Sequence, residues 1–103
     1  MKWPRIEPGA VEDLRAAIER LAREKPALEA AFSKTLRSSL ERIGKSPRQH
    51  ARLETNETDR EIRRVILRRF HYLVIYEMLH DVPHVLAVMH ASQQPNYWLT
   101  RDA

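Results

Sequence analysis

The 103-residue sequence predicts an α+β fold, in which an N-terminal antiparallel helix hairpin packs on a small antiparallel β-sheet. In the first half of the chain, apolar residues recur at intervals of three and four, which is typical of amphipathic helices. In the second half, β-branched and aromatic residues form short runs that turn sequences interrupt, which is typical of strands. With 43% hydrophobic and 31% charged residues, the chain is expected to form one globular domain over residues 1–103.

Two proline-initiated helices account for the first half. One is expected from Pro8 to near Glu24, because proline suits the first helical turn and the apolar repeat continues to Leu21. The second is expected from Pro26 to Gly44, where the following Ser-Pro sequence is a stop signal. Because the connection is tight, the two helices are expected to lie antiparallel.

Two further segments flank the helices. Residues 2–7 are expected to form a short edge strand, because Pro4 lacks an N–H and proline is tolerated only at the edge of a sheet. Residues 47–59 are polar and aperiodic, which predicts a surface loop.

Three strands are expected after residue 59. A single strand from Ile62 to Leu79 would be about three times the usual strand length, so a kink is expected at residues 70–72. Turn sequences at residues 80–83 and 92–95 then bound the last strand, which contains Val85–Met89. Short turns between consecutive strands predict an antiparallel sheet, with one face on the helices and the other partly open.

Composition excludes several kinds of site. The absence of cysteine excludes disulfides and thiolate chemistry, and the presence of only two glycines excludes a glycine-rich phosphate loop. His80 and His84 flank a turn without a third ligand in sequence, so neither a metal nor a cofactor is expected. The chain has no apolar run of membrane-spanning length and begins without a secretory signal, so we expect no membrane association and a cytoplasmic location.

A block of arginines is the main functional signal in the sequence. Five arginines fall within ten consecutive positions in which Glu61 is the only acid: Arg60, Arg63, Arg64, Arg68 and Arg69. Strand alternation sends neighbouring arginines to opposite faces of a sheet. We therefore expect at least two of the arginines at positions 63, 64, 68 and 69 to contact an anionic partner, either nucleic-acid phosphate or acidic protein side chains.

The second half of the chain also resembles a known family. An arginine-rich strand leads into Phe70-His71-Tyr72, Tyr76 follows, and the tail HASQQPNYWLTR runs from His90 to Arg101. These features resemble the RelE/ParE toxin superfamily, nearer its ParE branch, in which the strand ends in Arg-Phe-Pro-Tyr and the tail reads H-x-x-R-x-P-x-Y-W-x-x-R. Here His71 replaces the proline and Gln93 replaces the first tail arginine.

The resemblance implies the toxin of a type II toxin–antitoxin module, which forms a hetero-oligomer with a cognate antitoxin. A ParE-like toxin would bind DNA gyrase without catalysis of its own, whereas a RelE-like toxin would cut mRNA on the ribosome. For metal-independent cleavage, His90, Tyr97 and Arg69 are the residue types that transfer protons and stabilise a phosphate. Gln93 offers no charge to that reaction, which favours gyrase binding.

Plainer roles remain open for the same residues. His90 could cap its strand, and Tyr97 with Trp98 could fold back as a lid on the core, in which case Arg101 could join the arginine block. A third possibility is a small basic nucleic-acid-binding module. That class needs aromatic residues among the arginines on one exposed face, whereas Tyr72 and Tyr76 are expected to be half buried.

Overall fold

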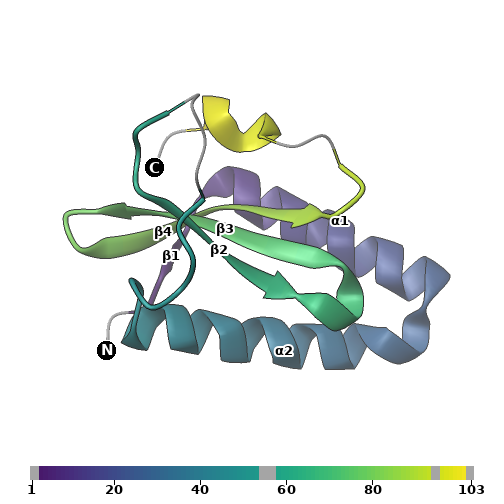
Figure 1. Cartoon of the computed structure of the whole chain (residues 1–103). Helices are drawn as coiled ribbons and strands as arrows, with labels where there is room; N and C mark the ends of the chain where they lie inside the picture. Colours follow the sequence, from purple (N-terminus) through teal and green to yellow (C-terminus); the bar gives the residue numbers. More distant parts are fainter. Residues whose placement is uncertain (1–2, 54–57, 94–95, 102–103) are drawn as a thin grey trace.

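The computed structural model describes residues 3–53, 58–93 and 96–101 (Figure 1). Its elements, in chain order, are β1 (Arg5–Ile6), α1 (Pro8–Glu24), α2 (Pro26–Lys45), β2 (Ile62–Leu67), the 3-10 turn η1 (Arg68–Phe70), β3 (Tyr72–Leu79), β4 (Val82–His90) and the 3-10 turn η2 (Tyr97–Thr100). The helices lie on one face of the sheet and η2 on the other (Figure 1). The predicted α+β class is therefore confirmed.

The helix hairpin forms where the proline and apolar pattern place it. Both helices begin with proline at the first helical position, and only Lys25 separates them. Their buried residues include Ala10, Ala17 and Leu21 in α1 and Phe32, Leu36 and Ile43 in α2. Because these positions repeat at helical spacing, each helix turns one apolar stripe toward the sheet and most of its charges toward solvent.

The sheet has the strand order β1-β4-β3-β2 and is mixed. The three strands after residue 59 pair antiparallel as predicted, but β1 pairs parallel with β4. The expectation of a wholly antiparallel sheet is wrong for β1 because short turns set direction only between consecutive strands, and β1 meets a strand from the far end of the chain. β1 is an edge strand as predicted, although it spans two residues rather than residues 2–7, of which residue 2 lies outside the described part.

Turns of left-handed backbone separate the strands. The predicted kink is formed by η1 and by His71, which follows it with φ 60°. His80 and Asp81 have φ of 51° and 63°, as in the two-residue turns that match strand twist. These two residues alone join β3 to β4, so Pro83 of the predicted turn lies in β4 instead. The turn predicted at residues 92–95 extends into residues outside the described part.

The tail closes much of the second face of the sheet. Trp98 is 1% exposed and packs against Ile62, Ile75, Leu86, Ala87 and Met89, so the expected aromatic lid is confirmed. Ile66 on the same face of β2 stays 41% exposed, so this face is open at that strand. Tyr72 and Tyr76 are buried rather than half buried, because the helix hairpin covers them. Within the described ranges, no helix has the length and apolarity needed to cross a membrane.

Candidate functional site

The arginine block divides into structural and exposed residues. Arg60 makes two bonds of 2.8 Å to the buried carboxylate of Glu77, and it also donates to the carbonyl oxygens of Leu99 and Arg101. Arg60 therefore fastens the tail to the sheet.

Arg63, predicted to contact a partner, is bound within the molecule. Its Nε lies 2.9 Å from Glu61, and it donates to the carbonyl oxygens of Arg48 at 3.2 Å and His50 at 2.7 Å. These bonds hold the segment before residue 54 against β2, where Arg52 also forms an isolated antiparallel bridge with Arg63. This segment was predicted to be only a surface loop.

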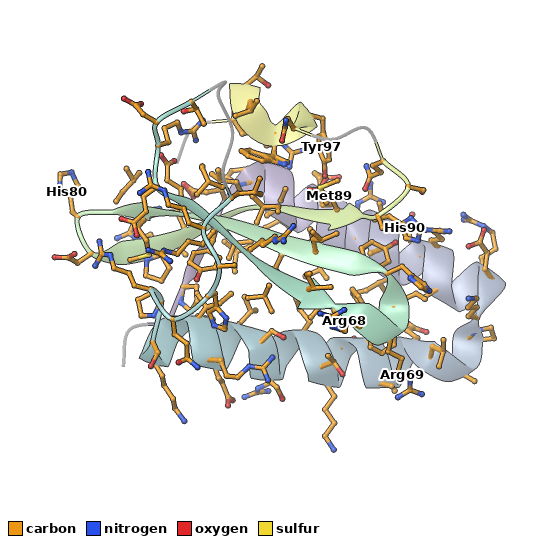
Figure 2. The ribbon with its side chains drawn as sticks, viewed as in Figure 1. Arg68, Arg69, His80, Met89, His90 and Tyr97 are labelled. Atoms are coloured by element: carbon orange, nitrogen blue, oxygen red, sulfur yellow. The ribbon has the colours of Figure 1, made fainter. Side chains whose placement is uncertain are left out.

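Arg64, Arg68 and Arg69 are exposed, and no carboxylate of the described residues pairs with them. We call these three residues the arginine surface. Figure 2 shows Arg68 and Arg69 where β2 turns toward β3. Both lie in η1 and not in the strand, so the alternation expected for them does not apply; it holds for Arg63 and Arg64. The cationic surface is thus smaller than the block in the sequence.

Arg101 lies away from the arginine surface, contrary to the expectation that it would join it. Its guanidinium donates to Asp13 of α1 at 2.8 Å and to the carbonyl oxygen of Leu86 at 2.8 Å, and it lies over the Tyr97 ring. Gly9 makes room for it, because a Cβ there would come within 2.9 Å of the Arg101 guanidinium carbon. Arg101 therefore holds the tail against α1, and we call its contacts with Asp13, together with those of Tyr97, the tail anchor.

Asp13 is the centre of this anchor. Besides Arg101, its Oδ2 accepts the Tyr97 hydroxyl and the Val88 backbone N–H, each at 3.0 Å. Burial and then the Asp13 carboxylate raise the pKa of Tyr97 well above its usual range. Tyr97 is therefore a neutral hydrogen-bond donor to Asp13, and its hydroxyl is already engaged.

His90 ends β4 in a turn that satisfies one ring nitrogen. Nδ1 accepts the Ser92 backbone N–H at 3.1 Å and lies 2.7 Å from the Ser92 hydroxyl. Burial, then Arg20 and His71, lower the His90 pKa, which favours the neutral ring. The Gln93 side chain accepts the His90 backbone N–H at 2.7 Å, so this residue caps the strand where the family pattern has an arginine.

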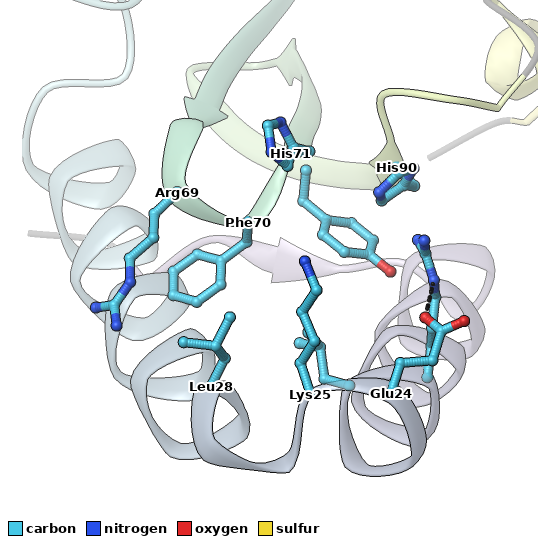
Figure 3. Close-up of a pocket in the computed structure, with 10 residues that line it drawn as sticks. Glu24, Lys25, Leu28, Arg69, Phe70, His71 and His90 are labelled. Carbon is cyan, nitrogen blue, oxygen red and sulfur yellow. Dashed lines mark hydrogen bonds and ion pairs between the residues drawn. The ribbon is translucent and has the colours of Figure 1, made fainter.

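A pocket opens between the tip of the helix hairpin and η1 (Figure 3). Its cations are Arg20, Lys25 and Arg69, its one acid is Glu24, and Tyr72 and the imidazoles of His71 and His90 also line it. We call it the hairpin-tip pocket.

The apolar walls of the hairpin-tip pocket are Leu21, Leu28 and Phe70. The pocket brings together two of the predicted catalytic residues, His90 and Arg69, but Tyr97 does not line it. Sequence reasoning missed the other cations, because they come from separate segments. In the sequence, the one sign of this pocket was His71, which stands where the family pattern has proline. No group of three or more potential metal ligands occurs in the described part.

The fold and site together define a small basic α+β protein with three cations around a pocket at one end of the sheet. Residues 5–95 match the family described as the ParE toxin of type II toxin–antitoxin systems, parDE. Because this match covers most of the chain, the protein belongs to that family, which implies a cognate antitoxin as partner. The predicted resemblance is confirmed. Among curated proteins, none matches the chain significantly.

Proposed function

We propose that this protein inhibits growth by binding DNA gyrase in the cytoplasm, without catalysis of its own, and that a cognate antitoxin neutralises it by forming a hetero-oligomer. Family membership supports the toxin class. The observation that carries the choice of mechanism is the separation of the groups that a nuclease would need.

RNA cleavage without metal needs a base, an acid and cations that converge on one phosphate. Tyr97 instead donates to Asp13, and Arg101 pairs with the same carboxylate. At the strand end, Gln93 contributes a neutral amide to a backbone N–H. The residues predicted to cooperate in catalysis are thus divided between the tail anchor and the hairpin-tip pocket.

The arginine surface is our candidate contact for the target. Arg64, Arg68 and Arg69 are exposed guanidinium groups, which bind carboxylate or phosphate through paired donors. Of the five predicted binding arginines, Arg63 and Arg101 are not proposed as contacts, because their guanidinium groups hold the fold together.

The outer edge of β2 is our candidate contact for the antitoxin. Residues 51–53 pair along its first half, through the Leu53 N–H to the Ile62 carbonyl and the Arg64 N–H to the Ala51 carbonyl. Val65–Leu67 pair with β3 on their inner edge, but on the outer edge no described segment pairs with them, and Ile66 is exposed. A partner can extend the sheet by adding a strand at such an edge.

Antitoxin binding should therefore raise the solubility and the thermal midpoint of the toxin, because it covers apolar surface and an unpaired strand edge. Gel filtration and thermal unfolding of the free and bound protein test this. A free toxin that is monomeric, equally soluble and no less heat-stable would contradict the proposal.

Induced expression with and without the neighbouring antitoxin gene tests the target. Gyrase binding should cause filamentation and an SOS response, and the purified protein should trap cleaved gyrase–DNA complexes. Replacing Arg68 and Arg69 by glutamine should abolish trapping, with the residual activity of single variants falling as salt rises. The matched control is Lys34→Gln with Arg37→Gln on the exposed side of α2, which removes the same charge. The absence of any growth effect in a sensitive host would refute the toxin proposal.

A RelE-like ribonuclease is the second candidate, because His90 and Arg69 share the hairpin-tip pocket with His71. In that case His90→Ala should lower cleavage by roughly 10²-fold with little change in RNA affinity, since proton transfer acts in the transition state. Tyr97→Ala is a poorer test, because it also releases the tail anchor. Ribosome-phased mRNA cuts, or a gain of RNA cleavage in Gln93→Arg, would replace the gyrase proposal with this one.

A further inference from the structure

We propose that the hairpin-tip pocket binds a carboxylate side chain presented by an acidic, leucine-rich segment of a protein partner. The site is distinct from the outer edge of β2, because it lies on the helix side of the sheet, between the helix hairpin and the end of β4 (Figure 3).

Charge is the first reason. Arg20, Lys25 and Arg69 line the pocket, and its one acid, Glu24, is already paired with Arg20 at 2.8 Å. No carboxylate of the described residues pairs with Lys25 or Arg69, and Figure 3 shows the Lys25 ammonium directed into the middle of the pocket. The Arg69 guanidinium lies on the other side of the Phe70 ring, so the Lys25 ammonium is the cation at the centre of the pocket, and without a counter-ion it attracts an anion.

Size is the second reason. The cavity volume is about 40 Å³. A single water needs at least roughly 10–15 Å³ of such volume, so the cavity has room for a carboxylate group but not for a nucleobase.

The aromatic rings also argue against nucleic acid. The Phe70 ring meets Phe32 edge-on at 5.3 Å and lies beneath the Arg69 guanidinium, with the charged carbon 5.4 Å from its centre. Tyr72 contacts Phe32 at 5.3 Å and His90 at 5.0 Å. Single-stranded nucleic acid binds by stacking bases on free aromatic faces along a basic track. These buried rings are occupied, and the exposed side of α1 near the pocket alternates arginine with glutamate.

The rim of the pocket is held in place by an unusual backbone. His71 has φ 60°, a conformation that favours glycine. Two bonds maintain it: its N–H donates to the Arg68 carbonyl at 3.3 Å, and its carbonyl accepts the Ala91 N–H at 2.7 Å. This fixes an exposed imidazole at the rim beside the cations. With Leu21 and Leu28 as apolar walls, the pocket matches a glutamate or aspartate that is followed by an apolar residue.

A histidine-detected NMR titration of the full chain tests the proposal. The probe is a hexapeptide of alternating glutamate and leucine, compared with the same peptide carrying glutamine in place of glutamate. We expect the glutamate peptide to shift the ring signals of His71 and His90 saturably and the glutamine peptide to leave them unchanged. Lys25→Gln should weaken binding at least about fivefold, because it removes the central cation. Lys34→Gln, an exposed lysine on α2 outside the pocket, is the matched control and should bind as the wild type does.

Three outcomes would overturn the proposal: equal binding of both peptides, no shift at millimolar peptide, or a ten-nucleotide RNA that shifts the same histidines at lower concentration. The last would assign the pocket to nucleic acid. The assay contains neither gyrase nor antitoxin, so its failure would leave the proposed function untouched.

Discussion

Replacing Asp13 with alanine should release the tail and destabilise the whole protein. The Asp13 carboxylate accepts hydrogen bonds from the Arg101 guanidinium, the Tyr97 hydroxyl and the Val88 N–H. Its side chain is 13% exposed and that of Arg101 27%, so water does not readily replace the lost acceptor. The substitution leaves these three donors, one of which is the partly buried cation of Arg101, without their common acceptor.

The expected loss is large for a protein of this size. A hydrogen bond to a charged group contributes about 1.5–3 kcal/mol, and bonds that share one carboxylate are not additive. We therefore expect Asp13→Ala to lower the free energy of unfolding by about 3–4 kcal/mol. With a urea dependence of about 1.5 kcal/mol per molar, the unfolding midpoint should fall by roughly 2 M.

Urea unfolding followed by tryptophan fluorescence measures this loss. Trp98 is the buried residue of the tail, so its emission reports directly on whether the tail is packed on the sheet, whereas Trp3 is exposed. Glu12→Ala is the matched control, because the neighbouring carboxylate on α1 makes only an exposed ion pair with Arg15 and its loss should leave the midpoint unchanged.

A double-mutant cycle between Asp13→Ala and Arg101→Ala should give a coupling energy of about 1–3 kcal/mol. A loss below about 1 kcal/mol in Asp13→Ala, or native Trp98 emission combined with zero coupling, would refute the role of Asp13 as the tail anchor.

Two other perturbations test the contact between Gly9 and Arg101 and the effect of partly buried histidines on stability. Gly9→Ala should destabilise the wild type, because the new Cβ displaces the Arg101 guanidinium. In an Arg101→Ala background the same substitution should stabilise the protein, because there only the higher helix propensity of alanine acts. The same sign in both backgrounds would contradict this. Stability should also fall as the pH drops from 7 to 5. Burial, followed by two nearby arginines, lowers the pKa of His50, so the unfolded chain binds the proton first, and His90 acts in the same direction. His50→Gln should flatten this dependence in urea midpoints measured across that range, and an unchanged slope would argue against it.

Local sequence patterns determined most of the elements. Proline positions and the apolar repeat located both helices, since helix ends depend on nearby residues. A single strand from Ile62 to Leu79 would be too long, which predicted the bend that η1 forms. Folding of the aromatic tail onto the core was one of the roles that the sequence left open, and the burial of Trp98 confirms it.

The roles of charged residues were decided by tertiary structure. Arginines that are equivalent in sequence divide between ion pairs and solvent according to which segment packs beside them, as the contrast between Arg63 and Arg64 shows. Arg101 is 88 positions from Asp13, and no local pattern signals that contact. Direction of pairing at β1 was likewise undetermined, because its partner is remote in sequence.

The hairpin-tip pocket shows the same difference between what local sequence patterns predict and what tertiary packing adds. The sequence predicted that His90 ends a strand, where a side chain can reach a cleft, and that Arg69 lies just before the bend at residues 70–72. Only the packing of the helix hairpin against the end of the sheet places Arg20 and Lys25 beside His90 and Arg69. The same packing places Tyr97 against Asp13, outside the pocket. Periodicity determines which face of an element is buried, whereas the neighbour that an exposed charge meets depends on how separate elements pack in space.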